Sequence, residues 1–263
     1  MKKSADGNSL IQKLQKEVEI FIETNPDIAD FMWTSFVDHK NRYINDLSLI
    51  NKYFKKGKSK KVMEIGSLPC HMTYCLKEMG FNTFGIDINP KVLSKFIRKC
   101  NLDVRKCDIE KQRLPFPDNY FDNILFNEVF EHLRIDPLST LKEINRVMKP
   151  KGIMILTTPN LYALHKIIMF NTGKGFNNAY IEFEKLSKYG YMGHIREYSV
   201  NEVKNILEKS GFKVKKVEYK LYNYFHTNKL FSNPYKKVFA YLLDYAMGMV
   251  PRFRPGQIFI ATK

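Results

Sequence analysis

The stretch V-M-E-I-G-S-L-P-C-H-M-T-Y-C-L-K-E-M-G-F-N-T-F-G-I-D-I-N, residues Val62 to Asn89, decides the fold. A short apolar run at Lys61–Ile65 stops at Gly66, which predicts a strand followed by a tight turn. Apolar residues at helical spacing come next, and then a second apolar run, Thr83–Ile86, ends on Asp87. A glycine turn after one strand and an acid about 20 residues later predict a nucleotide site in a doubly wound sheet.

The chemistry of this site depends on two residues. Gly66 has no side chain, so a ligand can approach the backbone of the turn. The carboxylate of Asp87 can accept hydrogen bonds from both hydroxyls of a ribose. The alternative is an ordinary turn between a strand and a helix that binds no ligand.

The turn at residues 64–70, E-I-G-S-L-P-C, resembles motif I of the class I S-adenosylmethionine-dependent methyltransferases. That motif usually reads acid-x-Gly-x-Gly-x-Gly. Glu64 and Gly66 match it, whereas Leu68 and Cys70 replace the second and third glycines. If Leu68 must adopt a positive φ, strain of about 1–2 kcal/mol is expected, and cofactor binding would weaken.

Two later stretches resemble the same family. One is L-P-F-P-D-N-Y-F-D-N-I-L-F-N-E-V-F-E-H-L at Leu114–Leu133, and the other is L-K-E-I-N-R-V-M-K-P-K-G at Leu141–Gly152. The resemblance covers about residues 60–220. It implies an α/β fold, a Rossmann-like doubly wound sheet of seven strands. In this family the last strand, here Gln257–Thr262, lies antiparallel between strands five and six.

The resemblance also implies how the chain is organised. Residues 1–58 would form an N-terminal helical segment that covers the site, and residues 59–263 the methyltransferase domain. Insertions are expected at about 161–193 and 222–256. Lys149–Gly152 is expected to form the turn that precedes the fifth strand.

The cofactor implied by the resemblance is S-adenosylmethionine. In such enzymes an acid after the third strand bonds the adenine amino group and the next backbone amide reaches the ring. Asp108 and Ile109 match these positions, although Asp108 could also be a solvated acid at a strand end. The expected cofactor-binding residues are Glu64, Gly66, Ser67, Asp87, Ile88, Asp108, Ile109 and Asn127.

A second group of polar residues follows the fourth strand. Glu128, Glu131 and His132 are spaced i, i+3 and i+4, so in a helical turn they would share one face. That face is expected at the carboxyl edge of the sheet, where ligands bind. His194 lies further along the chain, in the segment H-I-R-E-Y-S.

Glu-x-x-Glu-His, a later Thr-Pro-Asn and then a histidine together resemble the metal-dependent O-methyltransferases. These include small-RNA terminal 2′-O-methyltransferases and ubiquinone-pathway O-methyltransferases. The resemblance implies Glu128, Glu131, His132 and His194 as ligands of Mg²⁺, Mn²⁺ or Fe²⁺. The fuller His-Asp-His-x-Phe-Glu-Trp run of the RNA enzymes is absent.

Without a metal, other roles are open for these residues. Catalysis would then involve His132, His194 and Glu131, with an imidazole as general base that contributes about 10²–10⁴-fold. Alternatively, Glu128 is a charge at a helix terminus, Glu131 and His132 form an exposed turn, and none of them is catalytic.

The charge of the chain suits an anionic partner. The 263 residues include 43 Lys and Arg and 27 Asp and Glu, a net charge of +16. A lipid-linked saccharide or small-molecule acceptor, RNA and an acidic membrane surface all fit this charge, as does a solvated basic surface without a partner. The apolar run Val238–Val250 has basic flanks and is too short to span a bilayer, so it predicts an interfacial helix or a packed one.

The cysteines and the N-terminus bear on location. The four cysteines lack paired metal-ligand spacing and are expected to be reduced. Residues 1–9 contain no apolar run of the kind that a signal peptide has. These features predict a cytoplasmic protein, or one at the inner face of the membrane.

Three functions are therefore consistent with the sequence. The first is O-methylation of a hydroxyl on a sugar, a glycolipid or a related small acceptor. The second is RNA 2′-O-methylation. The third is a binding module with a degenerate methyltransferase fold, which the replaced glycines at Leu68 and Cys70 motivate.

Overall fold

The computed structural model describes residues 7–175, 178–189, 193–220 and 234–263. The chain divides into two compact units, each with its own internal contacts. Unit 1 comprises Met1–Phe126, Thr140–Met154 and Thr262–Lys263, and unit 2 comprises Asn127–Ser139 and Ile155–Ala261.

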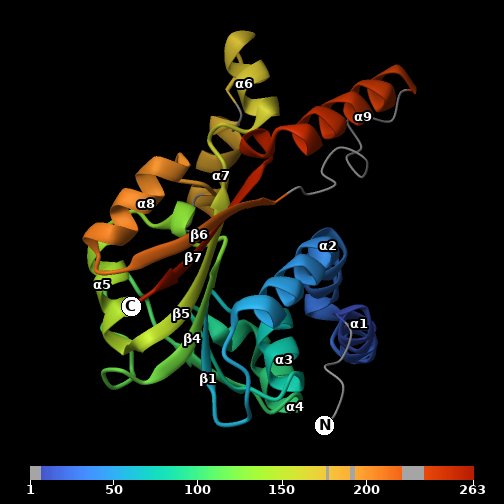
Figure 1. The fold of residues 1–263 in the computed structure, drawn as a ribbon. Helices are drawn as coiled ribbons and strands as arrows, with labels where there is room; N and C mark the ends of the chain where they lie inside the picture. Colours follow the sequence, from blue (N-terminus) through green and yellow to red (C-terminus); the bar gives the residue numbers. More distant parts are fainter. Residues whose placement is uncertain (1–6, 176–177, 190–192, 221–233) are drawn as a thin grey trace. The chain divides into compact units, whose positions relative to one another are not determined.

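The described residues form a seven-stranded sheet in the order β3-β2-β1-β4-β5-β7-β6 (Figure 1). The last strand is antiparallel and lies between β5 and β6, so the doubly wound fold expected from the sequence is confirmed. The strands are β1 (Lys61–Ile65), β2 (Asn82–Asp87), β3 (Asp103–Lys106), β4 (Phe121–Asn127), β5 (Met148–Pro159), β6 (Lys213–Lys220) and β7 (Gly256–Thr262).

The central strands are apolar because both of their faces are covered. β1 pairs in parallel with β2 on one side and β4 on the other. Six consecutive residues of β4, from Phe121 to Phe126, are buried. Four of these six residues are apolar, whereas the buried Asp122 pairs with Lys60 and Lys149. The remaining apolar run, Ile124–Phe126, does not alternate with polar residues, as is typical of a strand buried on both faces.

The N-terminal part of the described chain is formed by helices α1 and α2. Leu10, Leu14, Val18 and Phe21 form the buried stripe of α1, and α1 contacts both α2 and α3 within unit 1 (Figure 1). The helices are α1 (Gly7–Glu23), α2 (Ala29–Tyr53), α3 (His71–Glu78), α4 (Ser94–Lys99), α5 (Pro137–Val147), α6 (Leu164–Asn171), α7 (Ala179–Tyr189), α8 (Val200–Lys209) and α9 (Pro234–Met249).

The expectation of a turn at Lys149–Gly152 is wrong, because these residues belong to the continuous strand β5. Lys151 adopts a φ of 61°, and its amide donates to the carbonyl of Lys263 at 3.4 Å. A Cβ on Gly152 would lie 2.8 Å from the carbonyl oxygen of Lys149, so this bend has no room for a side chain there. Pairing with the chain terminus thus extends the strand through a segment that reads as a turn.

Candidate functional site

The turn after β1 is held against the end of β2. The amides of Gly66 and Ser67 donate to the carbonyl of Ile86 at 2.9 and 3.0 Å. Oδ2 of Asp87 accepts from the amide of Leu68 at 3.0 Å. Gly66 itself adopts a φ of 71°, a conformation that favours glycine. The glycine turn and Asp87 therefore lie at two neighbouring strand ends.

Asp108 joins them at the end of β3. The amide of Cys107 donates to the carbonyl of Asp87 at 2.9 Å, which holds the two strand ends together. Oδ1 of Asp108 accepts from the amide of Glu110 at 3.1 Å, so the carboxylate has a fixed orientation. Gly66, Asp87 and Asp108, distant in sequence, thus meet at the carboxyl ends of three adjacent parallel strands.

The strain expected at Leu68 lies elsewhere in the turn. Leu68 is not among the residues with positive φ, whereas Cys70 adopts φ 68° and ψ 11°. Cys70 is fully buried and immediately precedes α3. A left-handed conformation at a residue other than glycine costs about 1–2 kcal/mol. The replacement of the third glycine, not the second, therefore carries the conformational cost.

Glu64 points into the interior beneath this turn. Its side chain accepts a hydrogen bond from the hydroxyl of Thr73. The pKa of Glu64 is raised to about 8, mainly by burial and in part by the nearby charge of Asp87, although the Thr73 hydrogen bond opposes the shift. The carboxyl is therefore mostly protonated at neutral pH.

Ser67 packs closely against β2. A Cβ on Gly85 would lie 2.9 Å from Oγ of Ser67, so only glycine leaves room for this serine. Oγ of Ser67 is buried and has no hydrogen-bond partner among the described residues. Of the other expected cofactor residues, Ile88 is 57% exposed, Ile109 is half-buried, and Asn127 is the half-buried last residue of β4.

Unit 2 brings together three of the residues expected to do chemistry. Ligand atoms of Glu131, His132 and His194 all lie within 4.8 Å of one another. Oε1 of Glu131 lies 3.9 Å from Nε2 of each histidine. This oxygen is buried and has no hydrogen-bond partner among the described residues. The other oxygen, Oε2, accepts from the hydroxyl of Thr158 at 3.0 Å.

Each imidazole is oriented through its other nitrogen. Nδ1 of His132 lies 2.8 Å from the carbonyl oxygen of Gly193, and Nδ1 of His194 lies 2.9 Å from Oε1 of Glu197. Both partners accept, so Nδ1 is assigned as the donor in each ring. In the neutral rings, Nε2 then carries a lone pair that faces Glu131.

The protonation states fit this description. Burial lowers the pKa of His132, which favours the neutral ring. Burial raises the pKa of Glu131 well above its usual value, and the charge of Glu128 adds to the shift. The Nε2 atoms of two histidines and one carboxyl oxygen therefore converge. A cation bound among them would favour the ionised carboxylate, which burial otherwise disfavours.

Glu128 does not share a helical face with these residues, contrary to expectation. It adopts a φ of 52°, and only Phe130–His132 forms a short 3-10 helix. Oε1 of Glu128 instead accepts from the hydroxyl of Thr157 at 2.7 Å. The positive φ breaks the helical phase, so Glu128 lies outside the group formed by Glu131, His132 and His194.

A buried ion pair supports the histidine side of the cluster and was missed in the sequence. The ammonium of Lys166, from α6, contacts the carboxylate of Glu197, and both residues are buried. Burial raises the pKa of Glu197, but the His194 hydrogen bond and the Lys166 charge outweigh it and hold the pKa below its usual value. The charged carboxylate then holds the His194 ring in place.

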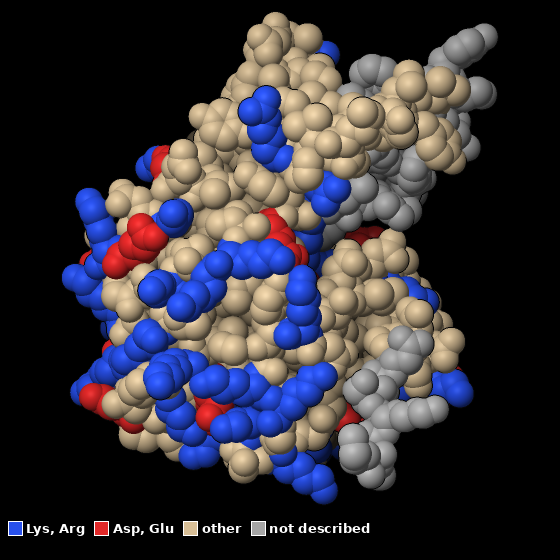
Figure 2. All heavy atoms as spheres, viewed as in Figure 1, with Lys and Arg blue, Asp and Glu red and all other residues tan. Residues whose placement is uncertain are grey.

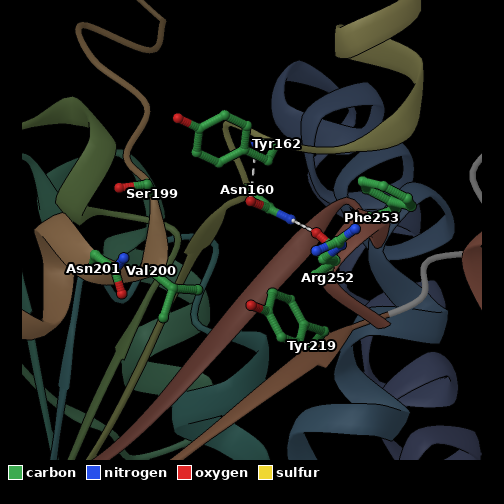
Figure 3. A pocket seen from close by; sticks show the side chains of 8 residues that line it. All are labelled: Asn160, Tyr162, Ser199, Val200, Asn201, Tyr219, Arg252 and Phe253. Atoms are coloured by element: carbon green, nitrogen blue, oxygen red, sulfur yellow. Dashed lines mark hydrogen bonds between the residues drawn. The ribbon is translucent and has the colours of Figure 1, made fainter. Parts of the chain in front are cut away.

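A pocket of about 340 Å³ lies elsewhere in unit 2 (Figure 3). The side-chain amide of Asn160 donates to the carbonyls of Arg252 and Arg254, both at 2.8 Å. Ser199 lines this pocket and is also the N-cap of α8, where its hydroxyl accepts a hydrogen bond from the amide of Glu202. The pocket is lined by Asn160, Tyr162, Ser199, Val200, Asn201, Tyr219, Arg252 and Phe253.

Comparison with known proteins agrees with this fold. A family model described as a methyltransferase domain matches residues 63–156. An uncharacterized protein of Methanocaldococcus jannaschii is 34% identical over 132 residues, which are 50% of this chain and 55% of that protein. A second from the same organism is 30% identical over 192 residues, 67% of this chain and 70% of that protein.

Further relatives carry functional names. The demethylmenaquinone methyltransferase of Staphylococcus saprophyticus is 30% identical over 146 residues, 51% of this chain and 60% of that protein. The chain thus spans little more than half the length of some of these relatives. A S-adenosylmethionine-dependent methyltransferase from Archaeoglobus fulgidus has the same fold, with a TM-score of 0.56 and 24% identity over 83% of this chain and 92% of that one.

Proposed function

Because this chain belongs to the class I S-adenosylmethionine-dependent methyltransferases, we propose that it methylates a hydroxyl of a sugar, a glycolipid or a related small acceptor. The observation that carries the proposal is the meeting of Gly66, Asp87 and Asp108 at three adjacent strand ends of unit 1. Asp87 would hold the ribose hydroxyls, and Asp108 would hold the adenine amino group.

Methyl transfer requires little covalent chemistry from the protein. The acceptor oxygen attacks the methyl carbon, the carbon–sulfur bond breaks, and S-adenosylhomocysteine leaves. The protein mainly aligns the two reactants. A sugar hydroxyl is a poor nucleophile until it loses its proton, so a proton acceptor is needed. Nε2 of His132 or His194 is the group that we propose takes it.

We further propose that Glu131, His132 and His194 hold a divalent cation. The fit rests on the unpartnered Oε1 of Glu131 and on the two Nε2 lone pairs that face it. A bound divalent cation would lower the pKa of a coordinated hydroxyl. Glu197 and the carbonyl of Gly193 would then act on the ligands by fixing the orientation of each ring.

The proposal is tested with methyl-labelled S-adenosylmethionine and the lipid, saccharide and RNA fractions of a cell extract. We expect label in the saccharide or lipid-linked saccharide fraction, in a form that survives mild base because it is an ether. His194→Gln should lower the rate at least about tenfold, whereas Glu208→Gln, at an exposed position on α8, should leave it unchanged. Failure to label any fraction would support the binding-module alternative.

Two controls separate the remaining alternatives. Chelation followed by return of Mg²⁺, Mn²⁺ or Fe²⁺ should remove and restore activity if the cation is required. If activity is complete in the presence of chelator, no cation is required, and an imidazole of His132 or His194 remains as the general base. Label confined to RNA, with affinity that falls steeply with salt, would instead indicate the 2′-O-methyltransferase alternative, which the basic surface in Figure 2 also fits.

A further inference from the structure

Helix α9 exposes a continuous apolar face. Its exposed side chains recur at i, i+3, i+4, i+7 and i+11, so they lie along one side of the helix. Each is between 60% and 70% exposed, although large apolar side chains are usually covered. They are Val238, Tyr241, Leu242, Tyr245 and Met249.

The exposed face belongs to a helix that is fixed to unit 2. Met247, on the other side of α9, is fully buried. The guanidinium of Arg254 donates to the carbonyls of Met247 and Gly248 at the end of the helix, and to that of Tyr219 in β6. The exposure is therefore a feature of a docked helix and not of a loose terminus.

Helix α6 contacts α9 and also exposes apolar side chains. The two helices contact each other and project from the same end of unit 2 (Figure 1). In α6, Phe170 is 52% exposed and Ile168 is 36% exposed. Lys166, which pairs with Glu197, is the buried residue of this helix. Neither helix is long and apolar enough to cross a bilayer, and the same holds for every other helix of the described residues.

The charges at this end of unit 2 are mainly positive. Residues 161–175 contain neither Asp nor Glu, and of their two lysines Lys174 is exposed whereas Lys166 is buried against Glu197. Residues 234–255 contain two lysines and two arginines against the single Asp244. Lys174 and Arg252 are exposed, and neither has an acidic partner within the described part of the chain. In Figure 2 this end is mostly tan with scattered blue.

We propose that the α9 face, together with α6, docks on an anionic lipid bilayer and lies in the plane of its surface. Apolar side chains would enter the boundary of the acyl chains, and Tyr241 and Tyr245 suit the interface because each has an apolar ring and a polar hydroxyl. Lys174 and Arg252 would face the anionic headgroups. A second copy of this chain fits less well, because a symmetric contact would bring the same positive charges together.

This surface is independent of methyl transfer, so its test uses the full chain without cofactor or acceptor. Sedimentation is measured with phosphatidylcholine vesicles that contain about one third phosphatidylglycerol, and with phosphatidylcholine alone. Binding to the anionic vesicles should be at least about tenfold tighter and should weaken with salt. No binding to anionic vesicles, or equal binding to both, would overturn the proposal.

Variants locate the contact. Leu242→Gln with Tyr245→Gln should weaken vesicle binding at least about tenfold. Ile20→Gln with Val37→Gln, at apolar positions of α1 and α2 that are 54% and 52% exposed, should not. Wild-type binding by the α9 variant would overturn the proposal. So would a dimer in solution that the α9 substitutions dissociate.

A spectroscopic variant guards against a helix that fails to fold. Leu242→Trp is placed in a Trp33→Phe background, so that the new indole is the single tryptophan of the chain. Its emission should shift to shorter wavelength when anionic vesicles are added, because the ring leaves water. An unchanged emission maximum while the protein sediments with vesicles would show that another surface makes the contact.

Discussion

Glu64 is a carboxyl group whose titration is coupled to folding. Its pKa is about 8 in the folded protein against an ordinary value of 4.5. Below about pH 4.5 it is protonated in both states, so ionisation adds no cost to its burial. As the pH rises toward 8, only the unfolded state ionises freely, and the folded state loses stability on the order of 4 kcal/mol.

Glu64→Gln should remove this pH dependence, because the amide resembles the protonated carboxyl. In urea unfolding, the variant's free energy of unfolding should exceed that of the wild type by more at about pH 8 than at about pH 5. Glu208→Gln, an exposed glutamate, is the matched control and should show no such trend. A constant difference between Glu64→Gln and wild type across this range would contradict the assignment.

Lys166 and Glu197 connect α6 to the segment that carries His194. Removing one partner of a buried pair leaves an uncompensated charge, so Lys166→Met should lower the free energy of unfolding by about 3–5 kcal/mol. The double variant Lys166→Met with Glu197→Gln should recover part of this loss. Lys204→Met, from an exposed pair on α8, should cost less than about 1 kcal/mol. Equal costs at both sites would show that the buried pair is not structural.

The elements that the sequence predicts well are those whose patterns are local. The strands β1 and β2 were predicted because each is a short apolar run, and the runs stop at Gly66 and at Asp87. The positive φ of Glu128 was not predicted, because no local pattern marks a left-handed residue other than glycine.

Contacts between distant residues could not be predicted in the same way. The bond from Lys151 to Lys263, which extends β5, joins segments more than a hundred residues apart. The pair of Lys166 and Glu197 depends on how α6 folds back within unit 2. Leu68 was expected to carry the strain of the glycine turn because the family motif places a glycine there, yet the backbone turns left-handed at Cys70.

The molecule as a whole combines the glycine turn after β1 in unit 1 with a Glu–His cluster and an apolar surface in unit 2. The net charge of +16 is shared by the membrane and RNA hypotheses, so charge alone does not separate them. The exposed apolar face of α9 favours the membrane hypothesis over the RNA hypothesis. Bilayer affinity requires apolar area, whereas nucleic-acid affinity depends mainly on phosphate contacts.

The most direct test of the central claim is calorimetric titration of the full chain with S-adenosylmethionine. We predict saturable binding to the wild type, with at least about tenfold weaker binding by Asp87→Asn, since a hydrogen bond to a charged group contributes about 1.5–3 kcal/mol. Asp103→Asn, an exposed acid of β3, should bind as the wild type does. No binding at millimolar cofactor, or equal affinity of Asp87→Asn and wild type, would contradict the account.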